Sequence, residues 1–135
     1  MKLNKILLID DDRPTNYIHK MIIERAAITN EIIVQQSAEH ALELLKSCPN
    51  EGGICPELIL LDINMPGMDG WEFLEHYRSL PLEQQAKYVV VMLTTSLNPQ
   101  DKKRAETYPE VKAFVNKPLT VDSIKETIGK LFTSS

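Results

Sequence analysis

Short apolar runs alternate with stretches of helical periodicity along the whole chain, and this alternation limits the folds that it can adopt. Five segments rich in Ile, Leu and Val favour strands: residues 5–9, 31–35, 57–61, 88–93 and 112–115. Three of them are nearly continuous in apolar residues, which is typical of strands covered on both faces. The alternation predicts an α/β fold, a doubly wound parallel sheet of five strands between two layers of helices.

The segments between the strands place apolar residues at helical spacing. The predicted apolar faces consist of Ile18, Met21, Ile22 and Ala26; Ala38, Ala41, Leu42 and Leu45; Phe73, Leu74 and Tyr77; and Val121, Ile124, Ile128, Leu131 and Phe132. Ser37 and Thr120 stand where an N-cap is expected. The turn residues Pro66, Gly67 and Gly70 lead into the third helix.

The fourth helix differs from the others. It is expected to begin at Asn98 and Pro99 and to run through "QDKKRAET", which offers very little apolar surface. A helix that buries little is held loosely and moves easily.

Length and charge limit the function classes. The 135 residues suggest a single domain over 1–135, with a core over about 5–132 and no output domain. The net charge of −4 argues against a nucleic-acid-binding surface and against a polybasic membrane anchor. No apolar run approaches the ~20 residues of a membrane span, and the first residues do not form a signal peptide. We therefore expect a cytoplasmic protein.

Cys48 and Cys55 lie in one predicted loop, without the further ligands that a zinc site needs. We expect two loop thiols in a reducing compartment, although the sequence also allows a disulfide across the loop. The three histidines, His19, His40 and His76, are expected to be solvated or partly packed. Trp71 is expected to be half-buried, near the site or on the third helix. The sequence does not decide whether the Lys117–Pro118 bond is cis or trans.

In an open parallel sheet, ligands bind beyond the carboxyl ends of the strands. The residues that follow the strands are Asp10, Asp11 and Asp12; Gln35, Gln36 and Ser37; Asp62 and Asn64; Thr94, Thr95 and Ser96; and Asn116 and Lys117. The second strand contributes no charge, which suits an edge position and the strand order 2-1-3-4-5. Carboxylates, hydroxyls and a lysine are thus predicted to meet at one edge of the sheet.

Three adjacent acids at the end of a buried strand repel one another, unless they diverge or a cation sits among them. Helix capping explains one acid, Asp12 or Asp11, but not three. Oxygen ligands from the first and third strands suit Mg²⁺, which Mn²⁺ could replace. A carboxylate beside such a metal can attack phosphorus, and Lys117 and Thr94 could neutralise the charge on the phosphoryl oxygens.

The stretches "LLIDDD", "LLDINMPGMDGWEFL", "VMLTTS" and "FVNKPLT" resemble the signatures of the response-regulator receiver domain. They occur in the family's order, each after a predicted strand, over about residues 5–132. The resemblance is to stand-alone, chemotaxis-type response regulators of two-component signalling, and it implies a flavodoxin-like, three-layer α/β/α fold.

The resemblance also implies a role for each matching residue. Asp62 would be the phosphoacceptor, and Asp10 and Asp11 the acidic pair that places Mg²⁺. The remaining roles would be a metal contact through the backbone carbonyl of Asn64 and phosphoryl contacts from Lys117 and Thr94. Thr94 and the aromatic Phe114 would form the switch and move toward the site after phosphorylation. Asn64 and Ser96 would flank the path of the hydrolytic water.

Two positions depart from the commonest pattern of the family. Thr95 stands where the smaller alanine or glycine is frequent. The size of this side chain affects how easily the aromatic Phe114 can switch. Phe114 lacks the hydroxyl that tyrosine would offer.

The implied function is a phosphorylation switch. The phosphodonor would be a sensor histidine kinase or a histidine phosphotransfer protein, and a partner protein would read the output. A monomer, or a weak dimer through the fourth helix, fifth strand and fifth helix, is expected, with no nucleic acid and no membrane. The chain would catalyse only its own phosphorylation and dephosphorylation.

Two alternatives stay open. The first is a haloacid-dehalogenase-like phosphatase, although Asn64 stands where such an enzyme carries a second aspartate. The second is an interaction module of the same fold that is never phosphorylated.

Overall fold

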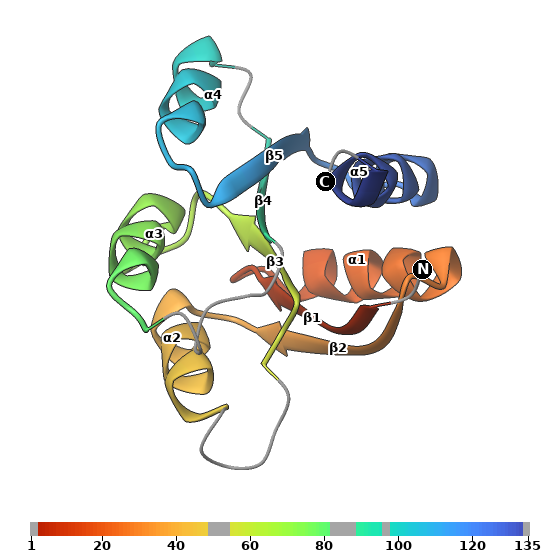
Figure 1. The fold of residues 1–135 in the computed structure, drawn as a ribbon, viewed down its shortest axis with the longest axis horizontal. Helices are drawn as coiled ribbons and strands as arrows, with labels where there is room; N and C mark the ends of the chain where they lie inside the picture. The colour runs from red at the N-terminus through yellow and green to blue at the C-terminus, as the bar shows by residue number, and fades with distance from the viewer. Residues whose placement is uncertain (1–2, 49–54, 82–88, 96–97, 134–135) are drawn as a thin grey trace.

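The computed structural model describes residues 3–48, 55–81, 89–95 and 98–133. Its strands form one parallel sheet in the order β2-β1-β3-β4-β5 (Figure 1). The strands are β1 (Leu3–Ile9), β2 (Thr29–Gln35), β3 (Leu58–Asp62), β4 (Val89–Thr94) and β5 (Val111–Asn116). The helices are α1 (Arg13–Ala26), α2 (Ala38–Ser47), α3 (Gly70–Arg78), α4 (Pro99–Glu106) and α5 (Val121–Thr133). The predicted fold class and strand order are confirmed.

Helices cover both faces of the sheet, as Figure 1 shows, with α1 and α5 on one side and α2 and α3 on the other. The central strands alternate between two cores. Leu7 and Ile9 of β1 pack in the core under α2 and α3, whereas Ile6 and Leu8 pack in the core under α1 and α5. A strand buried on both faces needs apolar residues at every position, which explains the unbroken run in the sequence.

The predicted apolar face of α1 is wrong in part. Ile18 and Met21 are 52% and 42% exposed, and the buried residues of α1 are Asn16, His19, Ile23 and Ala26. The helix is rotated because the side-chain amide of Asn16 donates to the backbone carbonyl of Asp10, at 2.7 Å. A buried polar group that finds its partner is tolerated in the interior, so Asn16 and His19 lie on the buried face of α1, while Ile18 and Met21 are exposed.

The predicted N-caps are confirmed. The Ser37 hydroxyl accepts from the backbone N–H of His40 at the start of α2. The Thr120 hydroxyl accepts from the N–H of Ser123 at the start of α5. These side chains satisfy backbone N–H groups that the first turn of a helix leaves without partners.

Helix α4 buries only Ala105, as its sequence predicts. It lies beside α3 through a group that we call the aromatic stack, made of Arg104, Trp71, Tyr108 and Arg78. The Arg104 guanidinium lies 4.4 Å from the centre of the Trp71 ring, Trp71 stacks on Tyr108 at 5.9 Å, and Arg78 lies 5.3 Å from the Tyr108 ring. Trp71 is on α3 as expected, but at 6% exposure it is buried rather than half-buried.

The expectation of free thiols is wrong. Cys48 and Cys55 form a disulfide between the end of α2 and the segment before β3. The two residues are close because α2 runs back along the sheet and ends near the start of β3, a proximity that composition does not reveal. The Lys117–Pro118 bond is cis. Among the described helices, none has the length and apolar character needed to cross a bilayer.

Candidate functional site

The carboxyl ends of four strands bring polar side chains to one edge of the sheet. Asp10 follows β1, Asp62 ends β3, Thr94 ends β4 and Lys117 follows β5. The registers place Ile9 beside Leu61 and Thr94 beside Asn116. The parallel sheet thus gathers residues that are more than a hundred positions apart, as the sequence predicts.

Lys117 lies between two buried acids. Its ammonium donates to Asp10 Oδ2 at 2.6 Å and to Asp62 Oδ1 at 3.0 Å. Asp10 and Asp62 are 1% and 5% exposed. Charged groups stay buried when they are paired and hydrogen bonded, and this trio meets both conditions while it keeps a net charge of −1.

Burial, followed by the negative charge of Asp10, raises the pKa of Asp62 above its usual value, although Lys117 and the backbone N–H of Asn64 act in the opposite direction. Burial would lower the pKa of Lys117, but the hydrogen bonds and charges of Asp10 and Asp62 raise it overall. The lysine is therefore a permanent cation beside Asp62.

Asp11 completes a group of three acids. One carboxylate oxygen of each of Asp10, Asp11 and Asp62 lies within 4.8 Å of the others. Three hard oxygen ligands around one point suit Mg²⁺ or Mn²⁺, which keep water in their remaining positions. These residues therefore fit the predicted metal. Asp12 has a different role: it is the N-cap of α1 and accepts from the backbone N–H of Thr15 at 3.0 Å.

The turn after Asp62 is held against the strand end. The backbone N–H of Gly70 donates to the carbonyl of Ile63 at 2.8 Å. A Cβ atom at residue 70 would lie 2.8 Å from the Asp62 carbonyl oxygen and 2.9 Å from the Ile63 Cα. Asp69 caps α3 in a capping box with Glu72. The glycine is needed because the helix starts directly against the backbone of the central acid.

The other predicted site residues surround this group. Thr94 is fully buried, and its carbonyl accepts from the backbone N–H of Lys117 at 2.7 Å. Phe114 is partly buried beside the core under α2 and α3. Asn64 and Thr95 are exposed, and Ser96 lies outside the described residues. The roles assigned to these residues stay predictions, because they concern a state that carries a metal or a phosphoryl group.

Sequence reasoning missed His19, which was expected to be solvated or partly packed. It is 2% exposed, and its Nε2 lies 3.5 Å from the backbone nitrogen of Leu119, two residues after Lys117. Burial, followed by the charge of Lys117, lowers the pKa of His19. The sequence signal for the burial of His19 was its spacing, since Asn16, His19, Ile23 and Ala26 lie on one helix face.

Comparisons with known proteins agree with this geometry. The chain matches the sequence model of the response regulator receiver domain over residues 6–129. It is 32% identical over 130 residues to the "Probable methanogenesis regulatory protein FilR2" of Methanothrix harundinacea, covering 93% of this chain and 79% of that protein. It is 29% identical to the "Chemotaxis protein CheY" of Pseudomonas aeruginosa, covering 95% of each.

A solved structure has the same fold. The crystal structure of a two-component response regulator from Cytophaga hutchinsonii superposes with a TM-score of 0.88 at 32% identity. The superposition covers 98% of this chain and 99% of that one.

Proposed function

This chain belongs to the response regulator receiver domain family, and from that membership and its site we propose that it is a Mg²⁺-dependent phosphorylation switch with Asp62 as phosphoacceptor. One observation carries the proposal. Asp62 is buried at the end of β3, shares Lys117 with Asp10, and lies within reach of the carboxylates of Asp10 and Asp11. A nucleophile, a fixed cation and a set of metal ligands are the parts that phosphoryl transfer needs.

In the proposed reaction a carboxylate oxygen of Asp62 attacks the phosphorus atom of a phosphohistidine. The new bond joins Asp62 and phosphorus, and the bond between phosphorus and the donor nitrogen breaks. Its electron pair stays on that nitrogen, which takes a proton from water. Lys117 is already within hydrogen-bonding distance of Asp62, so it meets the transferred phosphoryl oxygens without moving far. Asp10, Asp11 and Asp62, with the carbonyl of Asn64, would hold Mg²⁺, which neutralises phosphoryl charge when bound.

The proposed phosphodonor is a sensor histidine kinase or a histidine phosphotransfer protein, and the proposed output is binding to a downstream protein. The chain would not be an enzyme for other substrates; it would catalyse only its own modification and its reversal. Phosphorylation would shift α4 and β5, because α4 buries only Ala105 and loses few packing contacts when it moves.

Intact mass after incubation with Mg²⁺ and acetyl phosphate tests the proposal. We expect one added phosphoryl group, lost with EDTA and lost in Asp62→Asn. Asp12→Asn is the matched control, because this neighbouring acid caps α1 and is not among the three clustered acids. An adduct that persists in Asp62→Asn would contradict the proposal. Turnover of the donor without an adduct would favour a phosphatase, and neither adduct nor turnover would favour an interaction module.

A further inference from the structure

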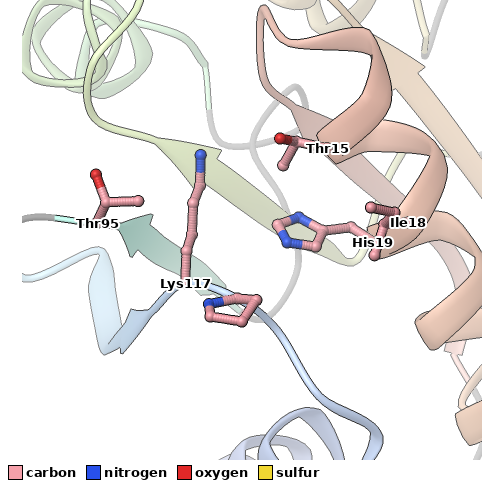
Figure 2. Close-up of a pocket in the computed structure, with 6 residues that line it drawn as sticks. Thr15, Ile18, His19, Thr95 and Lys117 are labelled. Carbon is pink, nitrogen blue, oxygen red and sulfur yellow. The ribbon is translucent and has the colours of Figure 1, made fainter.

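A cavity of about 260 Å³ opens beside the site, between α1 and the turn that joins β5 to α5. It is lined by Thr15, Ile18, His19, Thr95, Lys117 and Pro118 (Figure 2). About 150 Å³ is enough to hold a benzene molecule, so this space admits a small organic group. Lys117 belongs to the cavity and also contacts Asp62, so a molecule that reacts at Asp62 can extend into the cavity.

His19 lines this space and carries a hydrogen-bonding nitrogen without a partner in the described structure. The backbone N–H of Leu119 can only donate, so Nε2 of His19 must accept. The proton of the neutral ring is then on Nδ1, which is buried and has no hydrogen-bond partner in the described structure. In Figure 2 the imidazole lies across the cavity from the Lys117 side chain, with one nitrogen toward Thr15 and the Lys117 ammonium.

The remaining lining defines the ligand. None of the six described lining residues is acidic. The Thr15 hydroxyl already donates to Asp12, which leaves the His19 Nδ1–H, the Lys117 ammonium and the Thr95 hydroxyl as donors. Ile18 and Pro118 add apolar surface. Several donors beside an apolar wall, without an acid, suit a small carboxylate that carries an alkyl group.

We propose that this cavity is a leaving-group subsite for small acyl phosphates, in which His19 Nδ1–H donates to the departing carboxylate and Ile18 and Pro118 contact its alkyl group. The inference rests on the proposed phosphorylation of Asp62. An Asp62 oxygen bonds to phosphorus, the bond between phosphorus and the acyl oxygen breaks, and its electron pair leaves on the carboxylate. No proton is needed, and the negative charge develops where His19 donates.

The experiment compares two phosphodonors on the same protein. Acetyl phosphate releases a carboxylate, whereas phosphoramidate releases ammonia, which has neither an acyl group nor a negative charge. The readout is the ratio of the two second-order rate constants of Mg²⁺-dependent phosphorylation, followed by intact mass. A loss of folded protein lowers both rates equally and leaves this ratio unchanged.

Three variants separate the contributions to the ratio. His19→Gln keeps an acceptor for Leu119 but removes the donor at Nδ1, and we expect the ratio to fall about tenfold. His19→Asn keeps a donor near the Nδ1 position, and we expect it to retain most of the ratio. Ile18→Trp fills the cavity mouth from a side chain that is already 52% exposed, and we expect it to lower the ratio as well.

Each of the other outcomes would contradict the proposed leaving-group subsite. An unchanged ratio in His19→Gln would mean that Nδ1–H does not donate to the leaving group. Equal slowing with both donors would mean that His19 acts on Lys117 through Leu119 and not on the leaving group. If neither donor modifies the wild-type protein, the proposed function itself fails, which is distinguishable because both rates are then zero.

Discussion

At the scale of single residues, Asp62 ionises where burial and the charge of Asp10 both oppose ionisation. An acid whose pKa is raised in the folded state destabilises that state at every pH above both pKa values. We expect Asp62→Asn to raise the free energy of unfolding by about 1 kcal/mol at neutral pH without metal. Urea denaturation in EDTA measures the change.

The control for Asp62→Asn is Asp12→Ala, for which we expect the opposite sign. Hydrogen bonds from Thr15 lower the pKa of Asp12, so its carboxylate stabilises the start of α1. A destabilised Asp62→Asn protein would show that the hydrogen bond with Lys117 outweighs the repulsion between the two acids.

His19 predicts a dependence of stability on pH. Burial, followed by the charge of Lys117, lowers its pKa in the folded state, while the unfolded chain keeps a pKa of about 6.5. Below that value the unfolded state binds a proton that the folded state does not, so stability falls as the pH decreases, and it is fully present above it. We expect His19→Gln to lose less stability than the wild type between about pH 7 and about pH 5.5. Urea denaturation midpoints measure this difference. If the midpoints of the two proteins changed equally with pH, this account would be refuted.

At the scale of elements, the start of α3 depends on the absence of a side chain at Gly70. An added Cβ would press on the backbone of Asp62 and Ile63, which cannot move aside as a flexible side chain would. We expect Gly70→Ala to lower the free energy of unfolding by about 2 kcal/mol and to slow phosphorylation, because it displaces Asp62. Chemical denaturation and the phosphorylation rate check both effects.

Gly129 is the matched control, because it is also a helical glycine and a Cβ there would meet nothing within 4 Å. We expect Gly129→Ala to raise stability by about 0.5–1 kcal/mol, since alanine is the better helix former. Equal effects of the two substitutions would mean that helix propensity, rather than contact with Asp62, decides the result at Gly70.

The elements that the sequence predicted well are those set by local pattern. The strands could be predicted from their apolar runs alone. The N-caps could be predicted from a hydroxyl residue that precedes a helical pattern. The face of α1 was mispredicted because Asn16 and His19 are buried through partners at Asp10 and Leu119. Such partners come from tertiary contacts, which periodicity does not contain.

The candidate site was predictable because parallel strands end at one edge. Topology alone brings Lys117 to Asp10. The cavity beside His19 was not predictable, because it depends on the path of the chain after Lys117 and on the rotation of α1. The disulfide was missed for a related reason: the spacing of Cys48 and Cys55 allows the bond but does not require it.

At the scale of the whole molecule, the disulfide and the site lie at opposite ends of the sheet. Cys48 and Cys55 are near the start of β3, whereas Asp62 ends that strand. A cross-link over seven positions restricts the unfolded chain, so we expect the Cys48→Ser, Cys55→Ser double variant to lose about 2 kcal/mol of stability. We expect its phosphorylation rate to match that of the wild type. Denaturation curves and intact-mass time courses measure the two properties.

Reductant provides the control for the disulfide. It should lower the stability of the wild type to that of the double variant and leave the double variant unchanged. A reductant effect in the double variant would place the sensitivity elsewhere in the molecule.

The aromatic stack has a consequence for spectroscopy. Trp71 is the only tryptophan in the sequence, and the guanidinium of Arg104 lies against its ring. One partner of this contact belongs to α3 and the other to α4, the helix that is least buried among those described. The emission of a single indole depends on the charge beside it. The chain therefore carries a native chromophore that registers the departure of α4 from α3, so this helix can be followed in solution without a label.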